Sequence, residues 1–139
     1  MLGLIAGEGS VAGRQAFRQL LRDGQRPETQ RLALQLLARG AKTPAECLQL
    51  RRDLSELIVA PTQHAIIEGL IVARAQAALA DQDYAPAEED ARALLERYPG
   101  STQKGEALGV RLSVAWDLKR YRTAADIAVQ LRAVIADER

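Results

Sequence analysis

The chain has 139 residues, of which 47% are hydrophobic, and its formal net charge is +1. This length allows one domain with a buried core, and the apolar content argues against intrinsic disorder. The near-neutral charge argues against nucleic-acid binding, the single cysteine excludes an internal disulfide, and no apolar run is long enough to span a bilayer.

Helix start and stop signals divide the chain into about seven short helices, and no alternating strand pattern competes with them. The linkers between them are short, which favours antiparallel helical hairpins. The sequence therefore predicts an all-α fold. The expected helices span, in chain order, about 10–23, 27–40, 43–59, 62–81, 84–97, 103–118 and 121–137.

The clearest start signal is the sequence TPAE at residues 43–46. Thr43 caps the helix, Pro44 takes its first position, and Glu46 completes a capping box. Ser10 and Thr62 are the expected caps of the helices that begin near them.

Tyr84 and Tyr121 open two similar segments, and they lie 37 residues apart. Small residues recur at the same offset, at the points where the two helices of a hairpin would cross. A single hairpin cannot bury its apolar face, so copies are expected to stack. The further pairs at this offset are Arg74 and Arg111, Ala78 and Ala115, Leu79 and Trp116, Ala87 and Ala124, Ala91 and Ala128, and Leu94 and Leu131.

These segments resemble the tetratricopeptide repeat (TPR). The match covers QDYAPAEEDARALLERYPGS and KRYRTAADIAVQL, and the phrase RYPGSTQKGEAL is similar to the longer repeats of bacterial envelope proteins, such as outer-membrane-assembly lipoproteins and Tol–Pal-associated periplasmic proteins. The resemblance implies a TPR-like solenoid over residues 1–139. Its clearer repeats are 62–100 and 103–137, with a degenerate hairpin at 10–40 and a connecting helix at 43–59. The signature positions are Tyr84, Ala87, Ala91 and Pro99 in one copy, and Tyr121, Ala124 and Ala128 in the other.

In such a solenoid the first helices of the hairpins line a concave groove. Trp116 falls at a groove phase, where an indole can anchor a partner; the alternative is core packing against Tyr121. Arg74 and Arg111 share one phase and would flank the groove as a basic pair. The family's carboxylate clamp of lysines and asparagines is absent. The expected groove residues are Arg74, Gln76, Leu79, Arg111, Ser113, Trp116 and Asp117.

Other candidate sites have stronger structural interpretations. The glycines of GLIAGEG at 3–9 lack the strand that a nucleotide loop needs. Cys47 and His64 are expected to be packing or surface residues, and a Cys47–His64 dyad is an alternative that no neighbouring residue supports. The acidic run at 88–90 is interpreted as a solvated first helical turn, and Arg51 and Arg52 as an exposed pair.

The sequence thus predicts a non-catalytic scaffold or adaptor that binds a peptide or protein partner in its groove, with no cofactor, no metal, no nucleic acid and no transmembrane segment. The alternative is a spacer or self-association module of a larger protein, for which the resemblance suggests an envelope protein. The apolar face of the last helix (Leu131, Val134 and Ile135) suggests homo-oligomerisation or docking through a solenoid end. For the location, the resemblance suggests the bacterial periplasm or outer-membrane periphery, and the cytoplasm is the alternative.

Overall fold

The computed structural model describes residues 11–23, 26–60 and 64–137, and these residues form seven α-helices and no strand. The prediction of an all-α chain is therefore confirmed over this part of the sequence. Among the described residues, no helix is long and apolar enough to cross a membrane. The helices are α2 (Val11–Asp23), α3 (Pro27–Gly40), α4 (Pro44–Ile58), α5 (Ile67–Ala80), α6 (Tyr84–Arg97), α7 (Lys104–Asp117) and α8 (Tyr121–Asp137).

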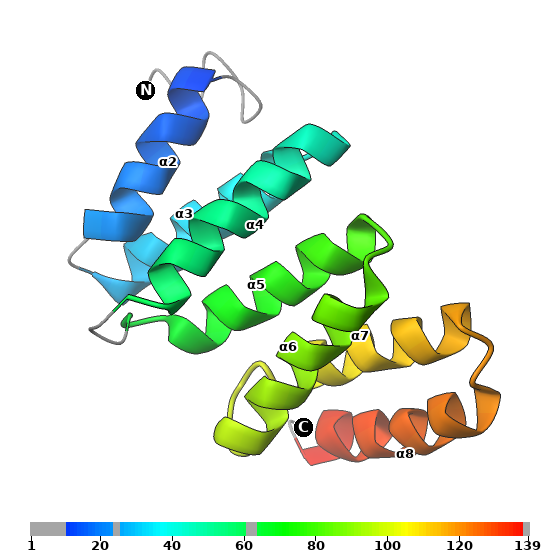
Figure 1. Cartoon of the computed structure of the whole chain (residues 1–139). Coiled ribbons are helices and arrows are strands. Elements are labelled where there is room, and N and C mark those ends of the chain that lie inside the picture. The colour runs from blue at the N-terminus through cyan, green and yellow to red at the C-terminus, as the bar shows by residue number, and fades with distance from the viewer. Residues whose placement is uncertain (1–10, 24–25, 61–63, 138–139) are drawn as a thin grey trace.

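The helices are stacked in a row, with α2 and α8 at its opposite ends (Figure 1). From α4 onward each helix packs extensively on the next, and α2 packs in the same way on α3. Contacts also join α3 to α5 and α5 to α7, whereas α3 and α4 touch only slightly. The helix α5 is therefore at the centre of the row, in contact with α3, α4, α6 and α7.

The capping box at the start of α4 forms as predicted. The Thr43 hydroxyl accepts a hydrogen bond from the Glu46 backbone N–H at 3.2 Å, and the Thr43 N–H donates to Glu46 Oε1 at 3.1 Å. Hydrogen bonding from Thr43 lowers the pKa of Glu46. This box satisfies two backbone donors at the point where the chain turns from α3 into α4.

The predicted start of the fourth helix near Thr62 is wrong, because α5 begins at Ile67. A hydrogen-bonded turn precedes it, in which the Ile67 N–H donates to the His64 carbonyl at 3.2 Å. The His64 ring ties this turn to α2: its Nε2 lies 2.7 Å from the Leu21 carbonyl, and its Nδ1 accepts the Ile66 N–H at 3.2 Å. Thr62 itself, like Ser10 and the glycines at 3–9, lies outside the described residues.

Two turns 37 residues apart have the same geometry. The first joins α5 to α6, with Gln82 at φ 58°, and the second joins α7 to α8, with Lys119 at φ 61°. In each turn one backbone hydrogen bond spans six residues (Asp83 N–H to Ala78 C=O at 2.8 Å; Arg120 N–H to Ala115 C=O at 2.7 Å). This is the Schellman arrangement, which satisfies carbonyls at a helix C-terminus. The repeat seen in the sequence is thus also a repeat of backbone structure.

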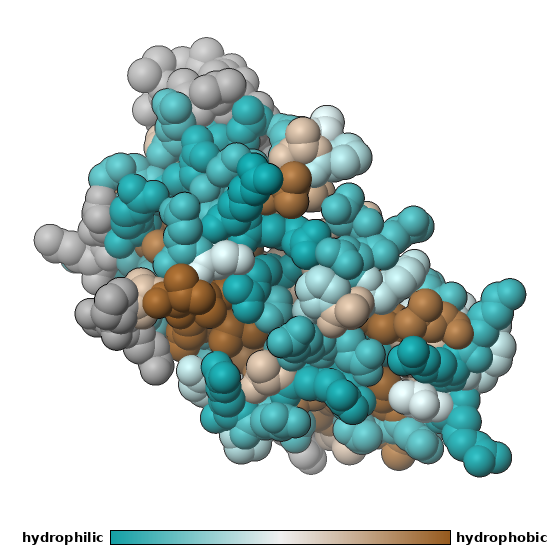
Figure 2. All heavy atoms as spheres, viewed as in Figure 1, coloured by the Kyte–Doolittle hydropathy of each residue, from teal (hydrophilic) through white to brown (hydrophobic). Residues whose placement is uncertain are grey.

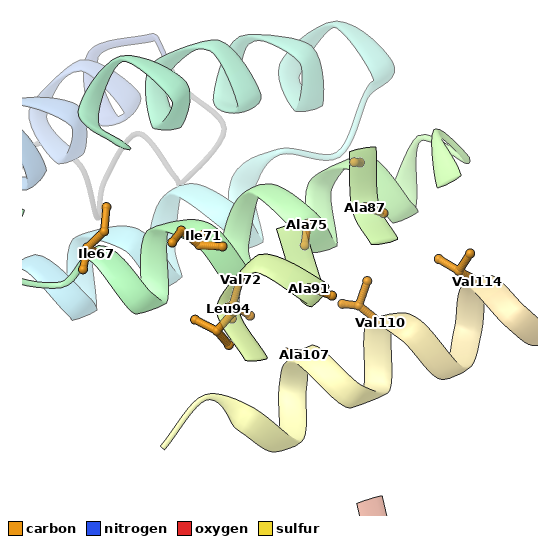
Figure 3. Close-up of a cluster of buried hydrophobic side chains, with 11 residues drawn as sticks. Ile67, Ile71, Val72, Ala75, Ala87, Ala91, Leu94, Ala107, Val110 and Val114 are labelled. Atoms are coloured by element: carbon orange, nitrogen blue, oxygen red, sulfur yellow. The ribbon is translucent and has the colours of Figure 1, made fainter. Parts of the chain in front are cut away.

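The core of the row is built around α5, which buries eight of its residues. On one side of α5, leucines of α3 and α4 pack against it; on the other, small side chains of α6 and α7 do. Figure 3 shows Val110 of α7 pointing toward Ala91 of α6, with Ala75 of α5 beside them. Alanines at these positions let the three helices approach closely, as the crossing pattern predicts.

Candidate functional site

A hollow of about 670 Å³ lies on the α7–α8 hairpin, at the C-terminal end of the row. Its wall is formed mainly by α7 and α8, with the end of α5 at one side. Most of its lining residues are apolar. They are Leu79, Ala80, Gln82, Leu112, Ser113, Trp116, Asp117, Tyr121, Ala124, Ala125 and Ala128. We call this surface the terminal hollow.

Trp116 and Tyr121 are the largest side chains of the terminal hollow. Their rings meet edge to face, with centroids 5.1 Å apart and an interplanar angle of 70°. Trp116 nevertheless keeps 62% of its surface exposed, and Tyr121 keeps 53%. The alternative of core packing for Trp116 is therefore wrong: the indole contacts Tyr121, but most of its surface faces solvent.

Four of the seven predicted groove residues line the terminal hollow, namely Leu79, Ser113, Trp116 and Asp117. Gln76 lies elsewhere, in a more polar hollow of about 350 Å³ between α3, α5 and the start of α7. Neither Arg74 nor Arg111 lines the terminal hollow. The structure therefore brings together the predicted apolar anchors and separates them from the predicted basic pair.

Arg74 is held on another side of α5 by a bidentate ion pair with Asp90 of α6. Its Nε donates to Oδ2 at 2.8 Å and an NH2 group donates to Oδ1 at 2.7 Å, while the remaining NH2 group donates to the Ser55 hydroxyl at 3.2 Å. The hydrogen bond to Asp90 raises the pKa of Arg74. Asp90 is only 8% exposed, so the interpretation of residues 88–90 as a solvated turn is wrong for this residue.

The second expected exposed group, Arg51 and Arg52, is also only half correct. Arg52 is exposed, but the Arg51 side chain is 17% exposed and pairs with Asp83 at 2.9 Å and Asp81 at 3.7 Å. The sequence around Arg51 does not indicate these partners, because both aspartates lie in the turn between α5 and α6, about 30 residues later. A hollow of about 690 Å³ lies over both ion-pair groups, and its walls carry charges of both signs.

Asp117 links the two hairpins. Its Oδ2 accepts a hydrogen bond from the Tyr84 hydroxyl at 3.2 Å, so the tyrosine of one hairpin binds the end of the next first helix. Partial burial, together with this bond, raises the pKa of Tyr84. Tyr121 takes the same place in the α7–α8 hairpin, but its hydroxyl has no hydrogen-bond partner within the described residues.

Cys47 and His64 are both engaged in packing contacts. Cys47 is partly buried, its Sγ lies 3.5 Å from the Ala41 carbonyl oxygen, and burial raises the pKa of the thiol. Both ring nitrogens of His64 are used by backbone groups of α2 and the turn before α5. In the part of the chain that the structure describes, no three His, Cys, Asp or Glu side chains are grouped so that they could hold a metal ion.

Sequence reasoning missed several lining residues of the terminal hollow. Tyr121, Ala124 and Ala128 were placed at packing positions, and Leu112 and Ala125 were not singled out. The offset of 37 residues was the signal that could have identified Leu112, Tyr121, Ala124 and Ala128, because it pairs them with residues of the α5–α6 core on which α7 packs.

Two further apolar surfaces are exposed. Figure 2 shows a hydrophobic patch over the end of α4 and the start of α5, on a face that is otherwise mostly hydrophilic; Val59, which is 75% exposed, ends α4. On α8, Leu131 and Val134 pack against the core of the last hairpin, whereas Ile135 remains 46% exposed.

Comparison with protein-family models, with curated proteins and with solved structures finds no match to this chain.

Proposed function

We propose that this protein is a non-catalytic adaptor with a TPR-like solenoid fold, and that it binds a protein or peptide segment in the terminal hollow. The observation that carries the proposal is the exposed Trp116, packed on Tyr121 in a largely apolar hollow of about 670 Å³. Exposed aromatic residues that border a concave apolar surface are typical anchors of protein interfaces.

Three features support the solenoid. The helices α3, α5 and α7 have 14 residues each. The helix α3 contacts α5, and α5 contacts α7, as the first helices of stacked hairpins do. The turns after α5 and α7 have one geometry, 37 residues apart. In this arrangement α4, α6 and α8 are the second helices. The N-terminal part departs from the plan, because α3 touches α4 only slightly and packs on α2 instead.

The lining of the terminal hollow favours a peptide over a small metabolite. Trp116, Tyr121 and Leu112 offer apolar area, and Ser113, Asp117 and Gln82 offer polar groups at its edge. The hollow lies on an outer face of the hairpin, and its two largest side chains remain more than half exposed. Metabolite sites usually enclose most of the ligand surface, whereas this surface fits an extended or helical segment.

A peptide-display selection against the protein tests the function directly. Peptides selected on the wild type should bind Trp116→Ala about 30-fold more weakly, because truncation of an anchor residue costs about 2 kcal/mol of binding energy. The matched control is Val59→Ala, which shortens an exposed apolar side chain at the end of α4, outside the terminal hollow. Both variants should keep the wild-type melting temperature. If the selected peptides bind Trp116→Ala as tightly as wild type, the proposed site is wrong.

A second candidate function is self-association, either alone or as a spacer module in a larger protein. The exposed Val129 and Ile135 on α8, together with the terminal hollow, favour it. In that case sedimentation velocity should show a dimer at micromolar concentration, and Ile135→Glu should dissociate it. A monomer at all concentrations would leave the adaptor as the better proposal.

A further inference from the structure

The terminal hollow repeats, position by position, a surface that is covered elsewhere in the same molecule. Five of its lining residues lie 37 residues after five members of the α5–α6 core on which α7 packs. The covered residues are Ala75, Leu79, Tyr84, Ala87 and Ala91, and their counterparts in the hollow are Leu112, Trp116, Tyr121, Ala124 and Ala128.

From this equivalence we propose that the terminal hollow receives one amphipathic helix of a protein partner, seated as α7 is seated on α5 and α6. The inference rests on the proposed function and specifies the partner. The covered hairpin shows what occupies such a surface: a single helix, α7, which contacts both α5 and α6 and whose Val110 points toward Ala91 (Figure 3).

The contacts of α7 define the chemistry of that helix. It presents Ala107, Val110 and Val114 to the α5–α6 core, and these residues are 0%, 3% and 1% exposed. Their spacing of i, i+3 and i+7 is one face of a helix. Asp117, three residues after Val114, accepts a hydrogen bond from the Tyr84 hydroxyl. The partner helix therefore carries alanine- to valine-sized residues at i, i+3 and i+7 and a carboxylate at i+10.

The terminal hollow offers a hydrogen-bond donor to the carboxylate of the partner helix. The Tyr121 hydroxyl takes the place of the Tyr84 hydroxyl, and within the described residues no group accepts its hydrogen bond. Lys119 and Arg122, both exposed, flank Tyr121. Neither cation lines the hollow, whose one charged lining residue is the acidic Asp117. The carboxylate contact of the partner therefore rests on the Tyr121 hydroxyl, and the two nearby cations add only long-range attraction for an acidic partner.

Side-chain size also restricts the partner. Leu112 and Trp116 stand where the covered surface has the smaller Ala75 and Leu79, so these positions leave less room for the side chains of the partner. A helix with leucine or phenylalanine at i+3 or i+7 would clash there, because packed surfaces do not accommodate extra methylenes without strain. Small residues are therefore required.

The test uses a synthetic helix of about 18 residues, cross-linked on its polar face because short isolated helices are marginally stable in water. The peptide carries Ala, Val, Val and Asp at i, i+3, i+7 and i+10, with a fluorophore for anisotropy. Ala128→Leu fills the hollow and should weaken binding at least tenfold. The matched control is Ala133→Leu, the same change at an exposed position of α8 outside the hollow, and it should bind as wild type does.

The carboxylate contact is tested by a double-mutant cycle. Tyr121→Phe in the protein and Asp→Asn in the peptide should each weaken binding three- to tenfold. Combined, they should weaken it little more than either alone, because both remove one interaction. Independent effects that multiply, or no binding of the peptide to the wild type, would overturn the inference.

The outcomes separate this inference from the proposed function. If display selection yields Trp116-dependent peptides that are extended or lack the acidic residue, the adaptor function stands and the helical partner is wrong. If the protein dimerises and Ala128→Leu dissociates the dimer, the occupant is a second copy and the inference is also wrong. Absence of any Trp116-dependent peptide would reject the adaptor itself.

Discussion

The α5–α6 and α7–α8 hairpins share one backbone plan but differ in what covers them. Their first helices have the same length, their turns each have a left-handed residue at the equivalent position (Gln82 and Lys119), and their second helices start 37 residues apart. Yet Ala91 is 1% exposed whereas its counterpart Ala128 is exposed. The difference arises because α7 packs on the first hairpin and no described helix packs on the second. Burial in a stacked fold is thus decided by the neighbour as much as by the pattern within the hairpin.

The two hairpins also differ in an ion pair. Arg74 pairs with Asp90, but at the equivalent positions 37 residues later the chain has Arg111 and Ile127, and the Arg111 Nε is buried without a hydrogen-bond partner among the described residues. The last hairpin therefore keeps the arginine without its acid. Ile127 is 2% exposed and belongs to the apolar core of that hairpin, so a core residue stands where the first hairpin has the acid.

The largest expected contrast is between Leu94 and Leu131. Leu94 is fully buried beneath α7, whereas Leu131 is only partly buried. Leu94→Ala should cost about 2–5 kcal/mol of unfolding free energy through lost burial and cavity formation. Leu131→Ala should cost clearly less. Urea denaturation of the two variants measures the difference, and equal losses would mean that the second hairpin is covered as well as the first.

The arginines should give opposite results. Arg74→Met leaves Asp90 buried without its partner and should cost about 2–4 kcal/mol, below the full value for a buried pair because the Arg74 side chain is 25% exposed. Arg111→Met removes an unsatisfied buried nitrogen and should be neutral or stabilise by up to about 1 kcal/mol. Thermal unfolding of both variants tests this contrast, and a large loss for Arg111→Met would show that its guanidinium has a stabilising role.

The crossing alanines provide a finer comparison. Sequence reasoning expects leucine to overpack the fold at both Ala91 and Ala128. The structure restricts this to Ala91, where Ala91→Leu should cost about 1–3 kcal/mol. Ala128→Leu should change stability by less than about 0.5 kcal/mol, since Ala128 is exposed. A large loss at Ala128 would place another part of the chain over the terminal hollow.

The smallest effect concerns Tyr84 at alkaline pH. Because its pKa is raised in the folded protein, the contribution of the neutral hydroxyl is complete below the unfolded pKa of about 10 and is lost as the pH rises through the folded value. Tyr84→Phe should therefore lower the urea midpoint at pH 7, and the gap from wild type should narrow at about pH 11. A gap that stays constant would exclude the Tyr84–Asp117 bond as its source.

Much of the fold follows from local signals in the sequence. The capping box of Thr43 and Glu46 and the prolines at the starts of α3 and α4 set helix bounds that the structure reproduces. The start of α5 was missed because His64 builds its turn with α2, which lies more than forty residues away in sequence. Long-range contacts of this kind leave no local pattern.

The candidate site was only partly predictable, again because some of its contacts are made between residues far apart in the sequence. Helical phase placed Leu79, Ser113, Trp116 and Asp117 on one surface, and the structure brings them together. Phase could not show that Arg74 turns toward Asp90, because the acid belongs to another helix and looked like part of a solvated turn. The exposure of Ala128 also depends on a neighbour rather than on the residue itself.

Fluorescence of Trp116, the only tryptophan of the chain, tests the central claim most directly. In the free protein acrylamide should quench this emission readily, because 62% of the residue is exposed. Addition of the cross-linked helix should shift the emission to the blue and protect it from quenching, and the Ala128→Leu variant should show neither change at the same peptide concentration. Emission that is already protected in the free protein, or that stays unchanged while the peptide binds, would contradict the assignment of the terminal hollow as the docking site.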